Sequence, residues 1–243
     1  MRIALLSDVH GNLPAFRSVL AAIEKETIDE IWCLGDLVGY GADPDGCVEL
    51  ARDTCAVCLA GNHDLVVTKD IPISDFSSSA AAAALWTREH ISAETLQFLR
   101  GRPSSDPERE PGLYHGSPRD PVWEYVLSTW QADECMDLMS SRVAAIGHSH
   151  VALWFGRAPS GEVGGGQAED GDETDMSAGE WLINPGSVGQ PRDGDPRAAW
   201  LLLDTEAWTA RWHRVEYPID EAAGAIEAAG LPSVLAARLY SGQ

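Results

Sequence analysis

The sequence predicts an α/β protein with two β-sheets. Through the first 150 residues, apolar runs of strand length alternate with stretches of helical periodicity, which is typical of β-α-β units and a mainly parallel sheet. The C-terminal part instead contains strands joined without long helices, which predicts an antiparallel or mixed second sheet. A chain of 243 residues, 44% of them apolar, can form one domain or two small ones, and we expect a single domain over residues 1–243.

The N-terminal part is expected to hold three strands and four helices. The strands are predicted at residues 3–7, 31–34 and 55–60, and the first helices at 13–26, 44–53 and 78–90. Pro14 suits the first turn of a helix, and Ser92 with Glu94 is typical of the N-cap and first turn of the fourth helix. Each predicted strand ends in a polar turn that contains glycine.

The rest of the chain is expected to be richer in strands. Strands are predicted at residues 113–115, 143–146, 151–155, 181–183, 199–204 and 209–217, and helices at 131–140, 219–229 and 233–240. Between residues 156 and 179, glycine and acidic residues dominate and no apolar period survives. This composition predicts a mobile acidic loop at about residues 157–180.

The charge and the cysteines exclude several classes of protein. The chain has 38 acidic and 17 basic side chains, and its net charge of −21 disfavours an extended nucleic acid or an anionic membrane as partner. No apolar run is long enough to span a bilayer, and the first one is too short for a signal peptide, so we expect a cytoplasmic protein.

Five cysteines predict no disulfide framework. Cys55 and Cys58, three apart on a predicted strand, would face opposite sides, which favours core positions over a redox or zinc pair.

Five short polar motifs follow predicted strands, at the sheet edge where α/β proteins bind ligands. Five of the seven histidines lie in these motifs, which are Asp8-Val9-His10, Gly35-Asp36, Gly61-Asn62-His63-Asp64, His115-Gly116 and Gly147-His148-Ser149-His150. Carboxylates, imidazoles and an amide oxygen form a ligand set that suits manganese, iron or zinc. Asp8 and His10 are two residues apart, as are His148 and His150, so in extended geometry each pair would face one ion. Six or seven ligands exceed one tetrahedral site and therefore predict two ions.

This ordered set of motifs resembles the calcineurin-like metallophosphoesterase superfamily, in particular its small bacterial and archaeal members. The resemblance runs from Asp8 to His150, roughly three-fifths of the chain, and the sequence INPGSVGQPR at residues 183–192 is similar to the segment that follows the last motif in those members. The resemblance implies a four-layer α/β/β/α sandwich in which two mixed β-sheets are flanked by helices. That architecture agrees with the two sheets predicted above.

The resemblance also implies the role of each motif residue. One metal ion would be bound by Asp8, His10, Asp36 and His150. Asp36 would bridge to a second ion, which Asn62, His115 and His148 would also bind. A metal-bridging hydroxide would attack the phosphorus of a small phosphomonoester or phosphodiester, and His63 would act as the general acid that protonates the leaving group.

The sequence departs from the Ser/Thr protein phosphatases of the superfamily at two places. Those enzymes carry an aspartate and an arginine where this chain has Gly39 and Tyr40, and a glutamate where it has Asp64. The missing arginine binds phosphate, and the missing aspartate orients the catalytic histidine. Asp64 is a candidate to orient His63, although neighbours in sequence often point in different directions. These departures disfavour a protein-phosphatase activity.

Several alternatives stay open at this point. Asn12, Arg119 and Tyr125 are candidates for substrate contacts, but Asn12 equally suits a tight turn, and surface positions suit the other two. The alternatives to a small-molecule phosphoesterase are a non-catalytic interaction module with the same fold, a nuclease, and an activity like that of the Ser/Thr phosphatases. We expect a small phosphorylated substrate as partner, with neither an extended nucleic acid nor a membrane, and the sequence leaves a homo-oligomer open.

Overall fold

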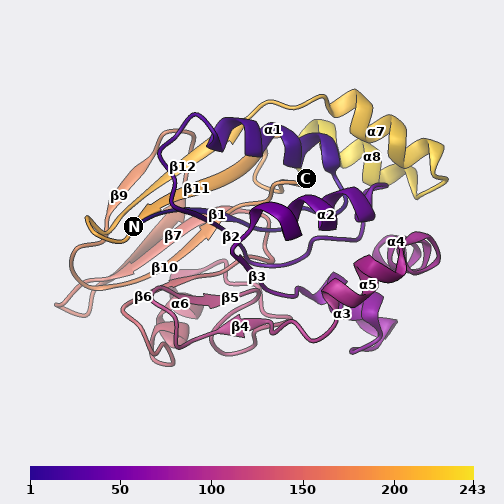
Figure 1. Ribbon diagram of the computed structural model, residues 1–243. Coiled ribbons are helices and arrows are strands. Elements are labelled where there is room, and N and C mark those ends of the chain that lie inside the picture. The colour runs from indigo at the N-terminus through magenta and orange to yellow at the C-terminus, as the bar shows by residue number, and fades with distance from the viewer.

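The computed structural model describes residues 1–243, whose strands form two six-stranded mixed sheets that pack face to face (Figure 1). The first sheet has the order β3-β2-β1-β11-β12-β9 and is made of Val57–Cys58, Glu30–Cys33, Arg2–Leu6, Ala198–Asp204, Thr209–Val215 and Glu173–Asp175. The second has the order β4-β5-β6-β10-β7-β8 and is made of Ser105–Asp106, Gly112–Tyr114, Val143–Ala145, Glu180–Pro185, Ala152–Arg157 and Val163–Gln167.

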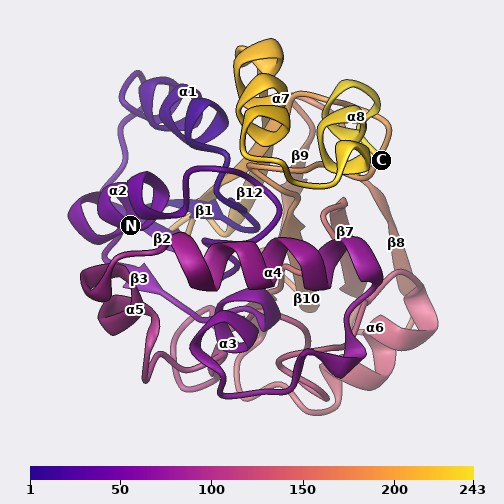
Figure 2. The ribbon, with the colours of Figure 1, turned by 90° about the vertical axis from the view of Figure 1, so that its right-hand side faces the viewer.

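Helices cover the outer face of each sheet. The helices are α1 (Leu13–Ile23), α2 (Pro44–Thr54), α3 (Asn62–Thr68), α4 (Ser78–His90), α5 (Ala93–Leu99), α6 (Thr129–Met136), α7 (Ile219–Ala228) and α8 (Ser233–Ser241), with a short 3-10 turn at Ile73–Asp75. Helix α6 lies alone against the second sheet, and α1, α2, α7 and α8 belong to the first sheet's side (Figures 1 and 2). The Ser92 hydroxyl accepts a hydrogen bond from the Thr95 N–H, which confirms the predicted cap of α5.

Alternation along the strands separates three apolar layers. On β1, Ile3 and Leu5 face the second sheet, while Ala4 and Leu6 face the helices. Both faces of this strand are buried, which explains its continuous apolar run. The layer between the sheets includes Trp32 and Trp212, and the third layer lies between the second sheet and α6. The predicted α/β/β/α sandwich is therefore confirmed.

The division of strands between the sheets differs from the prediction. The C-terminal strands do not form a sheet of their own, because β11 pairs antiparallel with β1 and, with β12, extends the first sheet. Conversely, β5 and β6 are parallel to β10 in the second sheet. The first sheet thus combines the first strands of the chain with the last, whereas the second is made of strands from the middle of the chain. Local periodicity does not reveal such pairing between distant segments.

Residues 157–180 are not a loop throughout, contrary to the prediction. The glycine-rich part forms edge strand β8, paired with β7, and Glu173–Asp175 forms edge strand β9, paired with β12. A Cβ at Gly165 would overlap the Phe155 ring, with its Cε1 atom 2.9 Å away, so glycine gives the neighbouring aromatic side chain room. The composition wrongly predicted a loop because these residues lack alternating apolar side chains. An edge strand can pair with an existing sheet through its backbone without such alternation.

Other boundaries shift by a few residues, and one helix was not predicted. Helix α1 ends at Ile23, three residues early, the strand predicted at 55–60 is regular only at Val57–Cys58, and α6 ends at Met136. Helix α3 begins within the Gly61-Asn62-His63-Asp64 motif.

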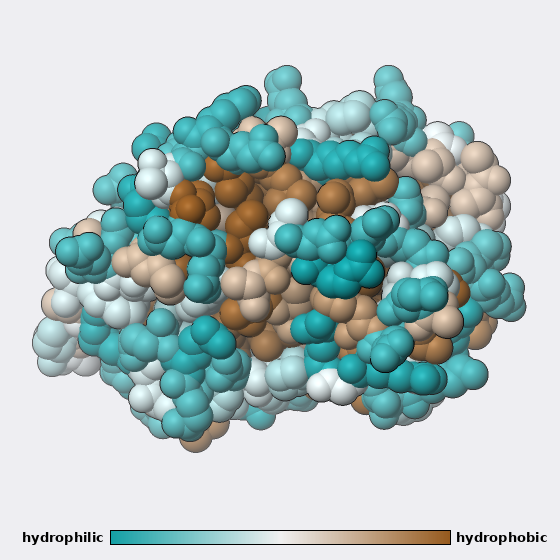
Figure 3. Space-filling view, in the orientation of Figure 1, coloured by the Kyte–Doolittle hydropathy of each residue, from teal (hydrophilic) through white to brown (hydrophobic).

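Hydrophilic residues dominate the face in Figure 3, around a hydrophobic band between α1 and α2. No helix is both long enough and apolar enough to cross a membrane.

Candidate metal centre

The structure brings the seven predicted ligands and His63 together at one end of the two sheets. The motifs follow β1, β2, β3, β5 and β6, so strands of both sheets point their carboxyl ends at this place. Every one of the eight side chains is buried, with at most 5% of the residue exposed. Such a concentration of buried imidazoles and carboxylates needs a compensating partner, because buried polar groups are costly when unpaired.

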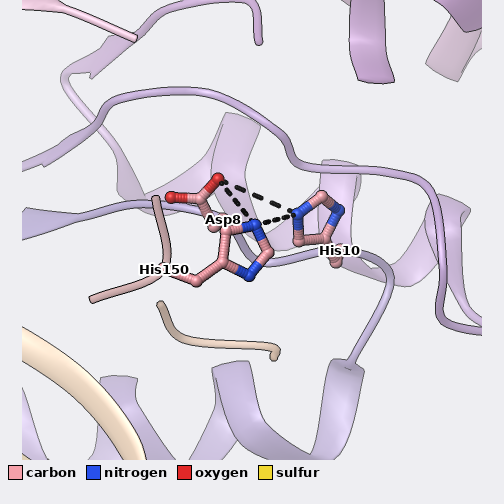
Figure 4. Close-up of side chains that lie close together, drawn as sticks. All are labelled: Asp8, His10 and His150. Carbon is pink, nitrogen blue, oxygen red and sulfur yellow. Dashed lines mark hydrogen bonds and ion pairs between the residues drawn. The ribbon is translucent and has the colours of Figure 1, made fainter. Parts of the chain in front are cut away.

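Asp8, His10 and His150 form the first group of converging side chains (Figure 4). The Nε2 atoms of the two histidines are 3.1 Å apart, and Asp8 Oδ1 lies 3.8 Å from His10 Nε2 and 3.4 Å from His150 Nε2. Asp8 follows β1, whereas His150 lies 142 residues later, after β6. The group therefore joins the first sheet to the second.

Asp36 lies between this group and a second one. Its Oδ2 atom is 3.5 Å from His10 Nε2 and 3.6 Å from His115 Nε2. Asp36, His115 and His148 converge as a second group, and Asn62 Oδ1 lies 3.3 Å from His115 Nε2. A carboxylate placed between two histidine-containing groups is the arrangement expected of a bridging ligand.

Backbone carbonyls orient the four imidazoles. Since a carbonyl oxygen only accepts, the ring nitrogen beside it carries the proton and the other nitrogen of a neutral imidazole keeps its lone pair. The bonds are His10 Nδ1 to Val38 O (3.1 Å), His115 Nδ1 to Leu34 O (3.0 Å), His150 Nδ1 to Gln190 O (2.6 Å) and His148 Nε2 to Trp123 O (3.2 Å). Burial lowers the pKa of all four below the ordinary value, that of His148 to about 3, which favours the neutral rings.

The donor set fits divalent cations. Asp8 Oδ1 and Asp36 Oδ2, the atoms that face the histidines, are buried and have no hydrogen-bond partner. Burial raises the pKa of Asp8 to about 7 and that of Asp36 well above its ordinary value. Lone pairs of His10 and His150 only 3.1 Å apart repel one another without a cation between them. Oxygen and imidazole donors with no thiolate suit manganese, iron or zinc.

The ligand loops adopt backbone conformations that the sequence did not predict. Five of the predicted ligands have positive φ angles and lie in the left-handed region, at Asp8 (+56°), His10 (+51°), Asp36 (+53°), His148 (+63°) and His150 (+60°). The expectation of extended geometry for the pairs Asp8/His10 and His148/His150 is therefore wrong, although the members of each pair still reach the centre. Non-glycine residues in this region store strain, which is typical of functional sites.

His63 is held by packing and not by Asp64. The Asp64 carboxylate accepts from the backbone N–H groups of Leu37 (3.3 Å), Val38 (3.1 Å) and Gly61 (3.0 Å), so it joins the loops after β2 and β3. The His63 ring instead lies against Tyr40 and Phe76, with ring centroids 4.4 and 4.5 Å away, and its Nδ1 atom is buried without a partner. The suggestion that Asp64 orients His63 is thus wrong. His63 also converges with His10 and Asp36.

A cavity of about 290 Å³ opens onto these residues. Its lining includes the sequence-predicted residues Asp36, Asn62, His63, His148 and His150 and the candidate Tyr125. Nine further lining residues were not assigned to the site by the sequence analysis: Tyr40, Asp75, Phe76, Ser77, Ala80, Trp123, Arg192, Arg238 and Gln243. Arg192 ends the segment INPGSVGQPR, and Tyr40 stands at a position where the Ser/Thr phosphatases differ; these were the only signals in the sequence for the two residues. The others come from helices and loops that the fold places over the candidate metal centre.

Asn12 and Arg119, the other candidates for substrate contacts, do not line this cavity. Asn12 caps α1 by accepting from the Ala15 N–H (3.1 Å) and donates to Gly189 O (2.8 Å), so its side chain has a structural role. Arg119 forms ion pairs with Glu124 and Glu134. The structure therefore does not bring either residue to the candidate site.

Comparisons with known proteins agree with the geometry. Residues 1–207 match the model of the calcineurin-like phosphoesterase superfamily domain. An uncharacterized protein of Methanocaldococcus jannaschii is 37% identical over 246 residues, which cover 99% of this chain and 98% of that protein. The crystal structure of a metallophosphoesterase from Sphaerobacter thermophilus is 39% identical, with a TM-score of 0.89 and full coverage of both chains. A hypothetical protein from Pyrococcus horikoshii, 21% identical, shares the fold with a TM-score of 0.79 over 100% of this chain and 98% of its own.

Proposed function

Because the chain belongs to the calcineurin-like phosphoesterase superfamily, we propose that it is a metal-dependent hydrolase of small phosphomonoesters or phosphodiesters. The observation that carries this proposal is the position of Asp36 Oδ2, which is buried and unpartnered between His10 and His115. An oxygen in that position is ready to bind cations on both sides. The residues of the sequence motifs are also buried, and most of the predicted ligands among them have strained backbone conformations.

The proposed centre holds two divalent ions, of manganese, iron or zinc. One would be bound by Asp8, His10, Asp36 and His150, and the other by Asp36, Asn62, His115 and His148, in line with the two groups of converging side chains. When bound, such ions lower the pKa of water and offset the charge of a phosphoryl group. The carbonyl partners of the imidazoles hold the ring orientations that binding requires.

His63 is proposed as the general acid. It lines the cavity beside the two groups, and its ring is fixed between Tyr40 and Phe76. Burial, together with Arg192 and His115, holds its pKa well below the ordinary value, so the free protein carries a neutral ring. A phosphoryl anion in the cavity favours the protonated imidazolium, which then donates its proton to the departing alkoxide.

The size of the cavity supports a small substrate. A volume of about 290 Å³ is at the lower end of small-molecule sites, and it does not suit a folded protein segment. The net charge of −21 disfavours a long polyanion across the whole surface, although it does not oppose a small anion at a centre that holds cations.

A substrate panel on protein of known metal content tests the proposal. The panel compares aryl and alkyl monoesters, diesters, cyclic nucleotides and dinucleoside polyphosphates, each with manganese, iron and zinc. We expect metal-dependent hydrolysis that a chelator abolishes. If the metal-loaded protein hydrolysed none of these esters, the proposal would fail, and a non-catalytic module with the same fold would be the better description.

A further inference from the structure

Arg192 is a half-buried cation in the cavity that the sequence analysis did not assign to the site. We propose that its guanidinium binds the non-bridging oxygens of the substrate's phosphoryl group, an inference that rests on the proposed function. Arg192 is the last residue of the sequence INPGSVGQPR and lies in the loop between β10 and β11. In the cavity lining it lies together with Asp36, His63 and His148.

One backbone and two side-chain hydrogen bonds hold Arg192 beside the candidate metal centre. Its backbone N–H donates to His150 O (3.0 Å), which ties the residue to one of the proposed ligands. Its Nη2 group donates to the Tyr40 hydroxyl (3.2 Å) and to Gln190 Oε1 (3.1 Å). The guanidinium carbon also lies 5.6 Å from the centre of the Tyr40 ring. These contacts hold the guanidinium through its Nη2 nitrogen.

The charge of Arg192 is not neutralised within the protein. Arg197 and Arg214 pair with Asp195 and Asp193, and Arg119 pairs with two glutamates. Arg192 forms no ion pair with any of the 38 acidic residues, and its Nε atom is buried without a hydrogen-bond partner. A desolvated donor without an acceptor costs free energy, so its retention at this place indicates an acceptor that arrives with a ligand.

The chemistry of the free donors points to a phosphoryl oxygen. Guanidinium presents five N–H groups in a planar fork, which matches the spacing of two oxygens on a phosphate. With Nη2 directed to Tyr40 and Gln190, the Nε donor has no acceptor. The guanidinium would therefore face the non-bridging oxygens of an ester bound in the cavity.

The test measures phosphate binding separately from turnover. Arg192→Gln, Arg192→Lys and Arg192→Ala are prepared in the full chain, with Arg211→Gln as matched control, since Arg211 is an exposed arginine on β12 outside the cavity lining. Metal content is measured first. Binding of inorganic phosphate to the metal-loaded proteins is then followed by calorimetry, and the KM and kcat for an aryl phosphate are determined in parallel.

We expect Arg192→Gln to keep its metal and to weaken phosphate binding by about 10- to 100-fold, the loss typical of a charge-assisted hydrogen bond. Arg192→Lys keeps the positive charge but lacks the planar pair of donors, so its phosphate affinity should lie between those of the wild type and Arg192→Gln. Added guanidinium should partly restore the kcat/KM of Arg192→Ala, which a merely structural residue would not allow. The Arg211→Gln protein should behave as wild type.

Two outcomes would overturn the inference and leave the proposed function intact. One is unchanged phosphate affinity in metal-loaded Arg192→Gln, and the other is loss of metal from all three Arg192 variants, which would make the residue a support of His150. Failure of the proposed function has a different signature, because the wild-type protein would then hydrolyse no ester at all while phosphate binding still reported on Arg192.

Discussion

The imidazole ring of His63 occupies the space that a side chain at Gly39 would need. A Cβ at Gly39 would overlap His63 Nδ1 and lie 2.9 Å from Cγ of the same ring. Gly39 also has a φ angle of +90°, which side chains disfavour. Glycine at this position therefore sets the orientation of His63 in the absence of any hydrogen-bond partner for Nδ1.

Gly39→Ala should consequently displace His63. We expect kcat to fall about 10- to 100-fold, because small misplacements of a reacting group have effects of this size, while the metal content stays unchanged. Because alanine disfavours a positive φ angle, the variant should also have a free energy of unfolding lower by roughly 1–2 kcal/mol. Steady-state kinetics and metal analysis check this, with Gly224→Ala, in open space on α7, as the control. Full activity in Gly39→Ala would show that His63 tolerates another position.

His63→Gln should retain its metal and slow the reaction according to the leaving group. Alkyl esters need a proton at the leaving oxygen, so their kcat should fall by about 10²- to 10⁴-fold, whereas aryl esters with good leaving groups should lose much less. The comparison requires a series of esters of graded leaving-group pKa. An equal loss across the series would argue against the general-acid role.

Asp36→Ala should abolish metal binding and hydrolysis together. The variant removes the oxygen shared by His10 and His115, so the second group loses its only carboxylate and the first group keeps only that of Asp8. Metal analysis by mass spectrometry and hydrolysis of an aryl phosphate measure the two effects, and Asp53→Ala, an exposed carboxylate on α2, serves as control. Substantial turnover by Asp36→Ala would contradict the assignment.

Metal binding should release protons below neutral pH. Burial raises the pKa of Asp8 to about 7 and that of Asp36 well above its ordinary value, so in the metal-free protein these carboxyls retain protons that a cation displaces. The histidine ligands are neutral already and release none. Apparent affinity should thus fall as pH drops below about 7. Calorimetry at pH 6 in two buffers of different ionisation heat counts the protons, and a count of zero would refute the expectation.

The pair of Asp193 and Arg214 should matter for stability. Their side chains are 5% and 3% exposed, and Asp193 Oδ2 also accepts from the Ala152 N–H (3.1 Å), so the pair joins the loop beside Arg192 to β12 and β7. Asp193→Ala leaves a buried guanidinium and should lower the free energy of unfolding by about 3–5 kcal/mol. Denaturant unfolding measures it. Asp133→Ala removes one of three exposed partners of Arg157, which keeps Asp137 and Glu180, and should cost no more than about 1 kcal/mol. Equal losses in the two variants would contradict the argument.

The residue types expected at the candidate centre, and the sheet edge on which they lie, could be predicted from the sequence. Predicted ligands such as Asp8, Asp36 and His115 follow apolar runs, and a strand's carboxyl end can be located from local pattern alone. The buried strands were recognisable for the same reason, since burial on both faces leaves a continuous apolar signal. The α/β class therefore followed from short segments read independently.

Tertiary structure alone decided how those segments combine. The pairing of β11 with β1 and the recruitment of the glycine-rich β8 as an edge strand depend on backbone hydrogen bonds between distant segments, which leave no local period. Likewise, Arg119 forms ion pairs with nearby glutamates while Arg192 lines the cavity without an ion pair, and nothing in the sequence around the two arginines predicts this difference. An arginine's role depends on which charges the fold places within a few ångströms of it, and that distance is a property of the folded chain.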